Sequence, residues 1–131
     1  MTHIVIVDDE ADTHMLYKLR FKKIFPNIGE NLKLVSFLSA RECLDYLQNP
    51  ETPKVDVVLS DINMPEMDGF SLLKQIRALS PQLPVYMVSA YESADFRQKA
   101  LQLGASRFLS KPVDFTALRQ MLLTDLQIPE Q

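Results

Sequence analysis

The side chains best suited to chemistry in this sequence are polar residues that follow short apolar runs. They are two neighbouring acids, a third acid, a hydroxyl and an ammonium group: Asp8, Asp9, Asp61, Ser89 and Lys111. Three carboxylates crowded together would repel one another and raise one another's pKa values unless a cation joined them. Hard oxygen donors with room for water suit Mg²⁺, which commonly bridges to phosphate. If the fold brings these residues together, they could therefore bind magnesium and handle a phosphoryl group.

Each of these residues also has a plain structural explanation when it is taken alone. Asp8 or Asp9 could cap a helix, and Asp61 could form a turn. Ser89 could be a loop hydroxyl and Lys111 a surface charge. The case for a site depends on whether the fold places them at one edge of a sheet.

The segment 55–69 is the one around which the chain is organised. Residues 55–59 make a short, β-branched apolar run, which is typical of a parallel strand covered on both faces. Asp61 follows at once, and the Pro, Asp and Gly residues of 63–69 then demand a turn. In open α/β sheets, the carboxyl end of such a strand is where ligands bind.

The rest of the chain alternates in the same way. Apolar runs predict five strands at about 3–7, 32–37, 55–59, 83–88 and 106–109. Helical spacing predicts five helices that begin near Asp12, Ser39, Gly69, Ser93 and Asp114, the first of them carrying Met15, Leu16, Leu19, Ile24 and Phe25. Right-handed crossovers between such units predict a doubly wound α/β protein with a parallel sheet.

Composition narrows the function classes. The 131 residues fit one domain, which we place at 1–125, with 126–131 as a C-terminal tail or truncated linker. A net charge of −3 with interspersed signs does not favour direct nucleic-acid binding. The first apolar run is too short for membrane insertion. The single cysteine, Cys43, predicts a buried thiol and fits a reducing cytoplasm.

Four segments together resemble the receiver domains of two-component response regulators. They are Val-Asp-Asp-Glu at 7–10, Ser-Asp-Ile-Asn-Met-Pro-Glu-Met-Asp-Gly at 60–69, Val-Ser-Ala at 88–90 and Phe-Leu-Ser-Lys-Pro at 108–112. The resemblance covers about residues 1–125. It implies a flavodoxin-like three-layer sandwich with strand order 2-1-3-4-5, which would place the first and third strands side by side.

The resemblance also implies a role for each site residue. Asp61 would be the nucleophile that takes a phosphoryl group, and Lys111 would neutralise the charge that develops. The ligands of Mg²⁺ would be Asp8, Asp9, Asp61 and the backbone carbonyl of Asn63. Ser89 would donate its hydroxyl to a phosphoryl oxygen, and Phe108 would be the ring that moves inward when this hydroxyl moves. The Lys111–Pro112 bond would be cis.

The predicted function is a phosphoacceptor switch, not an enzyme beyond its own phosphorylation and dephosphorylation. Its partners would be a histidine kinase or histidine phosphotransfer protein, and a downstream effector or an output domain missing from this chain. The alternatives are an aspartyl-nucleophile phosphatase, a flavodoxin-like mononucleotide binder and a phosphorylation-independent interaction module. Asn63 stands where the phosphatase pattern needs a second acid, and Asp8–Asp9–Glu10 would repel a bare phosphate.

Overall fold

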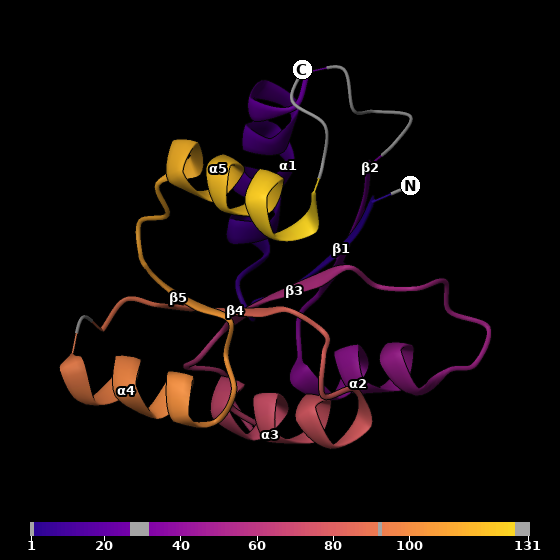
Figure 1. Ribbon diagram of the computed structural model, residues 1–131, viewed down its shortest axis with the longest axis vertical. Helices are drawn as coiled ribbons and strands as arrows, with labels where there is room; N and C mark the ends of the chain where they lie inside the picture. The colour runs from indigo at the N-terminus through magenta and orange to yellow at the C-terminus, as the bar shows by residue number, and fades with distance from the viewer. Residues whose placement is uncertain (1, 27–31, 92, 128–131) are drawn as a thin grey trace.

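The computed structural model describes residues 2–26, 32–91 and 93–127. Its centre is a five-stranded parallel sheet in the order β2-β1-β3-β4-β5 (Figure 1). The strands are β1 (Thr2–Val7), β2 (Leu32–Phe37), β3 (Val57–Asp61), β4 (Val85–Ser89) and β5 (Arg107–Ser110). The predicted doubly wound fold and strand order are therefore confirmed.

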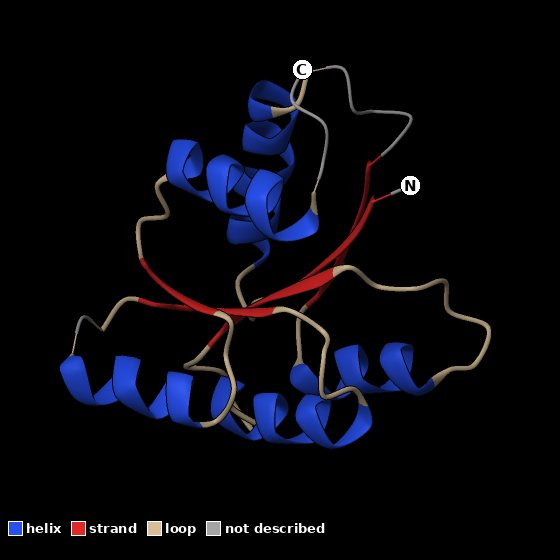
Figure 2. Cartoon of the chain, viewed as in Figure 1, coloured by secondary structure: helices blue, strands red, loops and turns tan. Residues whose placement is uncertain are grey.

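Helices cover both faces of this sheet, as Figure 2 shows. They are α1 (Ala11–Ile24), α2 (Ala40–Gln48), α3 (Gly69–Leu79), α4 (Ala94–Gln102) and α5 (Phe115–Leu126). The first and last helices lie on one face, and α2, α3 and α4 lie on the other (Figure 1). Each face has its own apolar cluster, because alternate residues of each strand point to opposite sides.

Four helices begin at a residue whose side chain caps the first turn. Ser39, Ser93 and Asp114 each accept a backbone N–H three residues later, as the sequence predicts. Asp68 caps α3 in the same way. The sequence did not predict this cap, because the residues of 63–69 indicate a turn. The first helix is the exception, because its N-cap Glu10 makes no side-chain cap bond.

The first helix buries only part of the face that apolar spacing indicates: at its C-terminal end Phe25 is buried and Ile24 packs against the core, as expected, but the first three apolar residues are exposed. Leu16 and Leu19 are 44% and 59% exposed, and Met15 is also exposed. The residues that α1 buries are instead His14, Tyr17 and Phe21. Tyrosine and histidine carry polar atoms, so a reading of apolar periodicity overlooks them, although their rings bury as much surface as leucine.

Gly69 brings α3 up against the end of β3. A Cβ atom at this position would collide with the backbone oxygen of Asp61. The Gly69 N–H donates to the carbonyl of Ile62 at 2.8 Å, which fixes the turn behind Asp61. The sharp turn demanded by the sequence therefore has a steric cause beyond turn propensity.

The same turn contains a strained residue, Glu66, whose φ of 67° lies in the left-handed region. We expect Glu66→Gly to raise the free energy of unfolding by about 0.5–1 kcal/mol, because glycine adopts this conformation without a Cβ penalty. Urea unfolding measures the change. Glu66→Ala is the control, since it keeps the Cβ atom. An equal gain in both variants would mean that the glutamate side chain, and not its backbone, is unfavourable.

Candidate functional site

The carboxyl ends of β1, β3 and β5 meet through one lysine. The Nζ atom of Lys111 lies 3.0 Å from Oδ2 of Asp8 and 3.4 Å from Oδ2 of Asp61. Parallel pairing aligns Val7 with Ser60, so Asp8 and Asp61 leave neighbouring strands at the same level. Three of the predicted site residues, which are distant in the sequence, are therefore in contact.

Both acids are buried and held by backbone groups. Asp8 is 2% exposed, and its Oδ1 accepts the Glu10 N–H at 2.9 Å. Asp61 is 6% exposed, and its Oδ1 accepts the N–H of Ile62 at 2.9 Å. Each carboxylate thus has one oxygen fixed by the backbone and the other directed to Lys111.

The charges of the site are incompletely balanced. Burial raises the pKa of Asp61, the positive charge of Lys111 lowers it, and the charge of Asp8 raises it again, so that the net change is upward. Burial would lower the pKa of Lys111, but its hydrogen bond with Asp8 and the nearby carboxylates outweigh burial and raise it. A further cation at these acids would remove the remaining repulsion.

Ser89 and Phe108 lie on the two strands next to this cluster. Ser89 is fully buried, and its Oγ accepts the N–H of Tyr91 at 3.0 Å. The Lys111 N–H donates to the carbonyl of Ser89 at 2.8 Å, which joins the ends of β4 and β5. Phe108 is only 7% exposed, and the guanidinium of Arg97 lies 4.9 Å from the centre of its ring. The Lys111–Pro112 bond is cis, as predicted.

The other predicted metal ligands, Asp9 and Asn63, are exposed at the rim. Carboxylate oxygens of Asp8, Asp9 and Glu10 lie within 4.8 Å of one another, so Glu10 joins a cluster in which the sequence analysis had not placed it. Asp61 does not share that cluster and meets Asp8 through Lys111 instead. Hard carboxylate donors beside a buried acid with a raised pKa fit Mg²⁺ in charge and in chemistry.

Two residues of α1 that the sequence analysis did not assign to the site lie next to it. Nε2 of His14 lies 2.7 Å from the backbone oxygen of Asp8. The pKa of Tyr17 is raised by burial and by the charges of Asp8 and Asp61, so its phenol lies within their electrostatic reach. The two residues lie one helical turn apart on the buried face of α1. In the sequence, their closeness to the site is indicated only by the acidic loop that precedes the helix.

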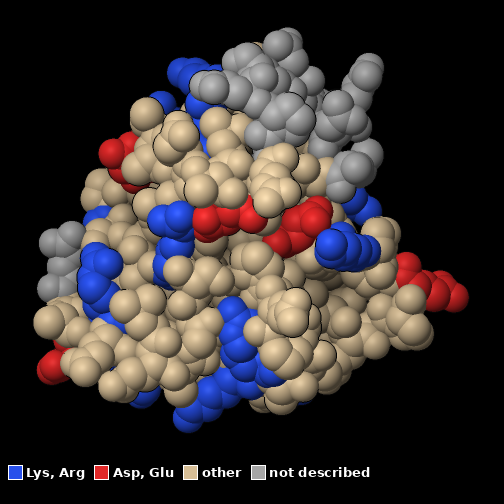
Figure 3. Space-filling view, in the orientation of Figure 1, with Lys and Arg blue, Asp and Glu red and all other residues tan. Residues whose placement is uncertain are grey.

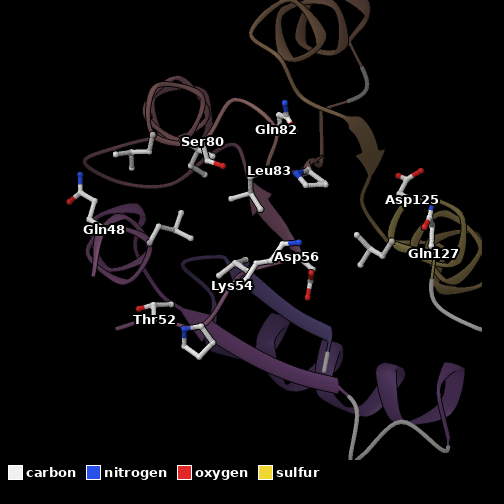
Figure 4. Close-up of a pocket in the computed structure, with 16 residues that line it drawn as sticks. Gln48, Thr52, Lys54, Asp56, Ser80, Gln82, Leu83, Asp125 and Gln127 are labelled. Atoms are coloured by element: carbon white, nitrogen blue, oxygen red, sulfur yellow. The ribbon is translucent and has the colours of Figure 1, made fainter. Parts of the chain in front are cut away.

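A pocket of about 710 Å³ lies away from the acids, at the amino ends of the strands. Figure 4 shows its wall, in which Gln48 is the last residue of α2, Ser80 follows α3 and Gln127 follows α5. On the face drawn in Figure 3, acidic and basic side chains are interspersed. The residues with candidate chemistry are therefore at the opposite, carboxyl end of the strands.

Fold and site together define a class of protein. A parallel sheet of order β2-β1-β3-β4-β5 carries an acid just after β1, an acid at the end of β3 and, after β5, a lysine that contacts both acids. This is a flavodoxin-like α/β protein with an acidic site at the topological switch point between β1 and β3.

The chain belongs to the response regulator receiver domain family, which matches residues 4–129. It is 35% identical over 126 residues to the transcriptional regulatory protein ZraR of Escherichia coli K12, covering 93% of this chain and 26% of ZraR. It is 40% identical over 109 residues to the DNA-binding transcriptional regulator NtrC of Klebsiella pneumoniae, covering 83% and 21%. The family acts in two-component signal transduction as a switch, not as a conventional enzyme.

Solved structures agree with the fold. The signal receiver domain of a DNA-binding response regulator from Colwellia psychrerythraea superimposes with a TM-score of 0.84 at 24% identity, covering 98% of this chain and all of that one. The chemotaxis protein CheY4 of Vibrio cholerae gives a TM-score of 0.80 at 25% identity, covering 95% and 98%. The chain spans at most about a quarter of the curated relatives named above. None of the helices within the described residues is long and apolar enough to cross a membrane.

Proposed function

We propose that this chain is a phosphoacceptor switch that takes a phosphoryl group on Asp61. The observation that carries the proposal is the contact of one lysine, Lys111, with the buried carboxylates of both Asp61 and Asp8. In this proposal Asp61 is the nucleophile, Lys111 supplies a positive charge beside it, and Asp8 is the second acid. Phosphoryl transfer needs mainly such alignment and charge neutralisation.

The transfer itself is a substitution at phosphorus. A carboxylate oxygen of Asp61 forms a new P–O bond, while the P–N bond of a phosphohistidine donor breaks and its electron pair returns to the imidazole. Lys111 neutralises charge on the phosphoryl oxygens and is held in place by Asp8. The Ser89 hydroxyl donates to a phosphoryl oxygen after it leaves the Tyr91 N–H.

Magnesium is the proposed cofactor, with Asp8, Asp9, Asp61 and the backbone carbonyl of Asn63 as its ligands. The ion would add a second positive charge, next to that of Lys111, and so balance the charge of the acids. It would also polarise the phosphoryl group. Its support is the cluster of carboxylate oxygens at the start of α1 and the raised pKa of Asp61.

The proposed phosphodonor is a histidine kinase or a histidine phosphotransfer protein, docked on α1. A pocket of about 710 Å³ lies between α1 and the segment after β5, and its wall includes Leu16, Arg20, Lys111 and Phe115. The pocket adjoins the lysine that contacts Asp61, so a donor seated there would present its phosphohistidine to the nucleophile. Met15 and Leu19 are also exposed on α1 and offer further apolar side chains on the same helix.

We expect Leu16→Asp to slow transfer from such a donor about tenfold, which is the loss of one apolar anchor of an interface. Uptake from acetyl phosphate should be unchanged, because a small donor needs no docking surface. Leu101→Asp on α4 is the control, since Leu101 is 50% exposed but belongs to another surface. Equal transfer to the two variants would place the donor elsewhere.

The proposed output is a change in the surface of α4, β5 and α5, read by an effector protein or by an output domain of a longer chain. Ser89 and Phe108 lie at the inner edge of that surface, and Arg97 of α4 covers the ring of Phe108. We also propose a cytoplasmic location. The unpaired and fully buried Cys43 fits a reducing compartment.

Acetyl phosphate with and without Mg²⁺ tests the proposal. We expect intact-mass spectrometry to find one added phosphoryl group only with Mg²⁺, and peptide mapping to locate it on Asp61. Asp9→Ala should weaken both Mg²⁺ binding and uptake, since it removes a ligand. A wild-type chain that stays unmodified at saturating Mg²⁺ would instead favour the phosphorylation-independent interaction module.

A further inference from the structure

The turn between β1 and α1 is held by contacts to every polar atom of Asp8. Its N–H donates to the carbonyl of Phe37 at 3.1 Å, and its carboxylate oxygens accept the Glu10 N–H and the Lys111 ammonium. Its backbone oxygen is contacted by Nε2 of His14 at 2.7 Å. A carbonyl oxygen only accepts, so Nε2 carries the proton and donates it.

This contact leaves the other ring nitrogen unsatisfied. His14 is only 8% exposed, and among the described residues its Nδ1 is the one buried side-chain N or O atom without a hydrogen-bond partner. A leucine would fill a similar space on α1 without burying a ring nitrogen that has no partner. Packing alone therefore does not account for a histidine at this position, whereas its bond to Asp8 does.

We infer that His14 is a positioning residue for the acidic site. Its hydrogen bond to the Asp8 carbonyl fixes the backbone there, so that the Asp8 carboxylate faces Lys111. The same bond keeps the exposed Asp9 and Glu10 within the carboxylate cluster. Without the imidazole donor, the Asp8 carbonyl has to rotate toward water to find a new hydrogen bond. The loop that carries Asp8, Asp9 and Glu10 then rotates with it. The inference rests on the proposed magnesium-dependent function and adds to it a residue that touches neither metal nor phosphate.

The test compares two replacements of His14 with a control on the same helix. His14→Leu removes the donor, and His14→Gln keeps an N–H donor at a similar reach. Phe21→Leu is the control, because Phe21 is also buried on α1 but lies two turns further along the helix. Mg²⁺ affinity is measured by titration calorimetry and by the amide shifts of residues 8–10 and 61–62, and folding by urea unfolding.

We expect His14→Leu to raise the Mg²⁺ dissociation constant roughly tenfold, the lower end of what partners of metal ligands contribute. Phosphoryl uptake should fall more at limiting than at saturating Mg²⁺. His14→Gln should recover most of the affinity, and Phe21→Leu should lose stability with an unchanged dissociation constant. If His14→Leu fails to fold, His14→Asn, whose amide is too short to reach, replaces it.

Three results would overturn the inference: a wild-type dissociation constant in the donor-free variant, no recovery in His14→Gln, or an equal loss of affinity in Phe21→Leu. The failure of the proposed function looks different. In that case the wild-type chain itself would bind no Mg²⁺ and take no phosphoryl group in the same titrations.

Discussion

Replacing Asp61 with asparagine is expected to abolish phosphoryl uptake and, at the same time, to make the fold more stable at neutral pH. Uptake ends because the amide is not a nucleophile, and no other acid of the cluster takes its place at the end of β3. Stability rises because the variant no longer buries a charge whose pKa is raised by burial and by Asp8. Mass spectrometry and urea unfolding measure the two effects.

The stability effect has a defined dependence on pH. In the folded chain the pKa of Asp61 lies above its ordinary value of 3.8, so the folded state binds this proton more tightly than the unfolded state does. The stabilisation that comes from this tighter proton binding is complete at a pH below the pKa of the unfolded state. It is lost as the pH rises through the raised pKa of the folded state. Without Mg²⁺, the advantage of Asp61→Asn should therefore grow as the pH rises from the ordinary pKa of 3.8 through the raised pKa of the folded state, and level off above it. A pH-independent advantage would indicate a packing effect.

Lys111→Ala is expected to lower the uptake rate about a hundredfold, the usual cost of losing one donor that stabilises transition-state charge. It should also lose most of the conformational response. Moving a switch from 1:99 to 99:1 takes about 5.5 kcal/mol, while one charge-assisted hydrogen bond is worth roughly 1.5–3 kcal/mol. The hydroxyl of Ser89 alone is thus insufficient, and the contacts of Lys111 must supply much of the difference.

Ser89→Ala is the matched comparison for the lysine variant. It should still accept the phosphoryl group but respond only in part, since it loses one of the two contacts. Amide chemical shifts of residues 93–110, recorded with and without phosphorylation, report the response. Identical shift changes in Ser89→Ala and in the wild type would show that the coupling does not run through the hydroxyl.

The order and type of the elements could be predicted from the sequence because each element carries a local signal. Ser39, Ser93 and Asp114 mark three helix starts, and the apolar runs mark the five strands. The sheet order could not be obtained from those runs, since pairing is a non-local property, and it came from the family resemblance. The two charged contacts of Lys111 depend on that order.

The orientation of α1 could not be predicted for a different reason. Met15, Leu16 and Leu19 are the more apolar residues, yet Tyr17 and His14 are buried beside the acids. Their burial depends on tertiary contacts that no periodicity records: Nε2 of His14 meets the Asp8 carbonyl, and the ring of Tyr17 packs against Phe115. The same limit applies to Glu10, whose carboxylate joins a cluster formed by the shape of one turn.

The position of β1 between β2 and β3 has a consequence for biosynthesis. This strand is made before both of its neighbours, β2 and β3. As the chain leaves the ribosome, β1 can pair with β2 first, but its other edge stays open until β3 emerges. The interval in which a nascent chain presents an unpaired apolar edge therefore ends when residues 57–61 clear the exit tunnel. The strand that closes this edge is also the one that carries Asp61.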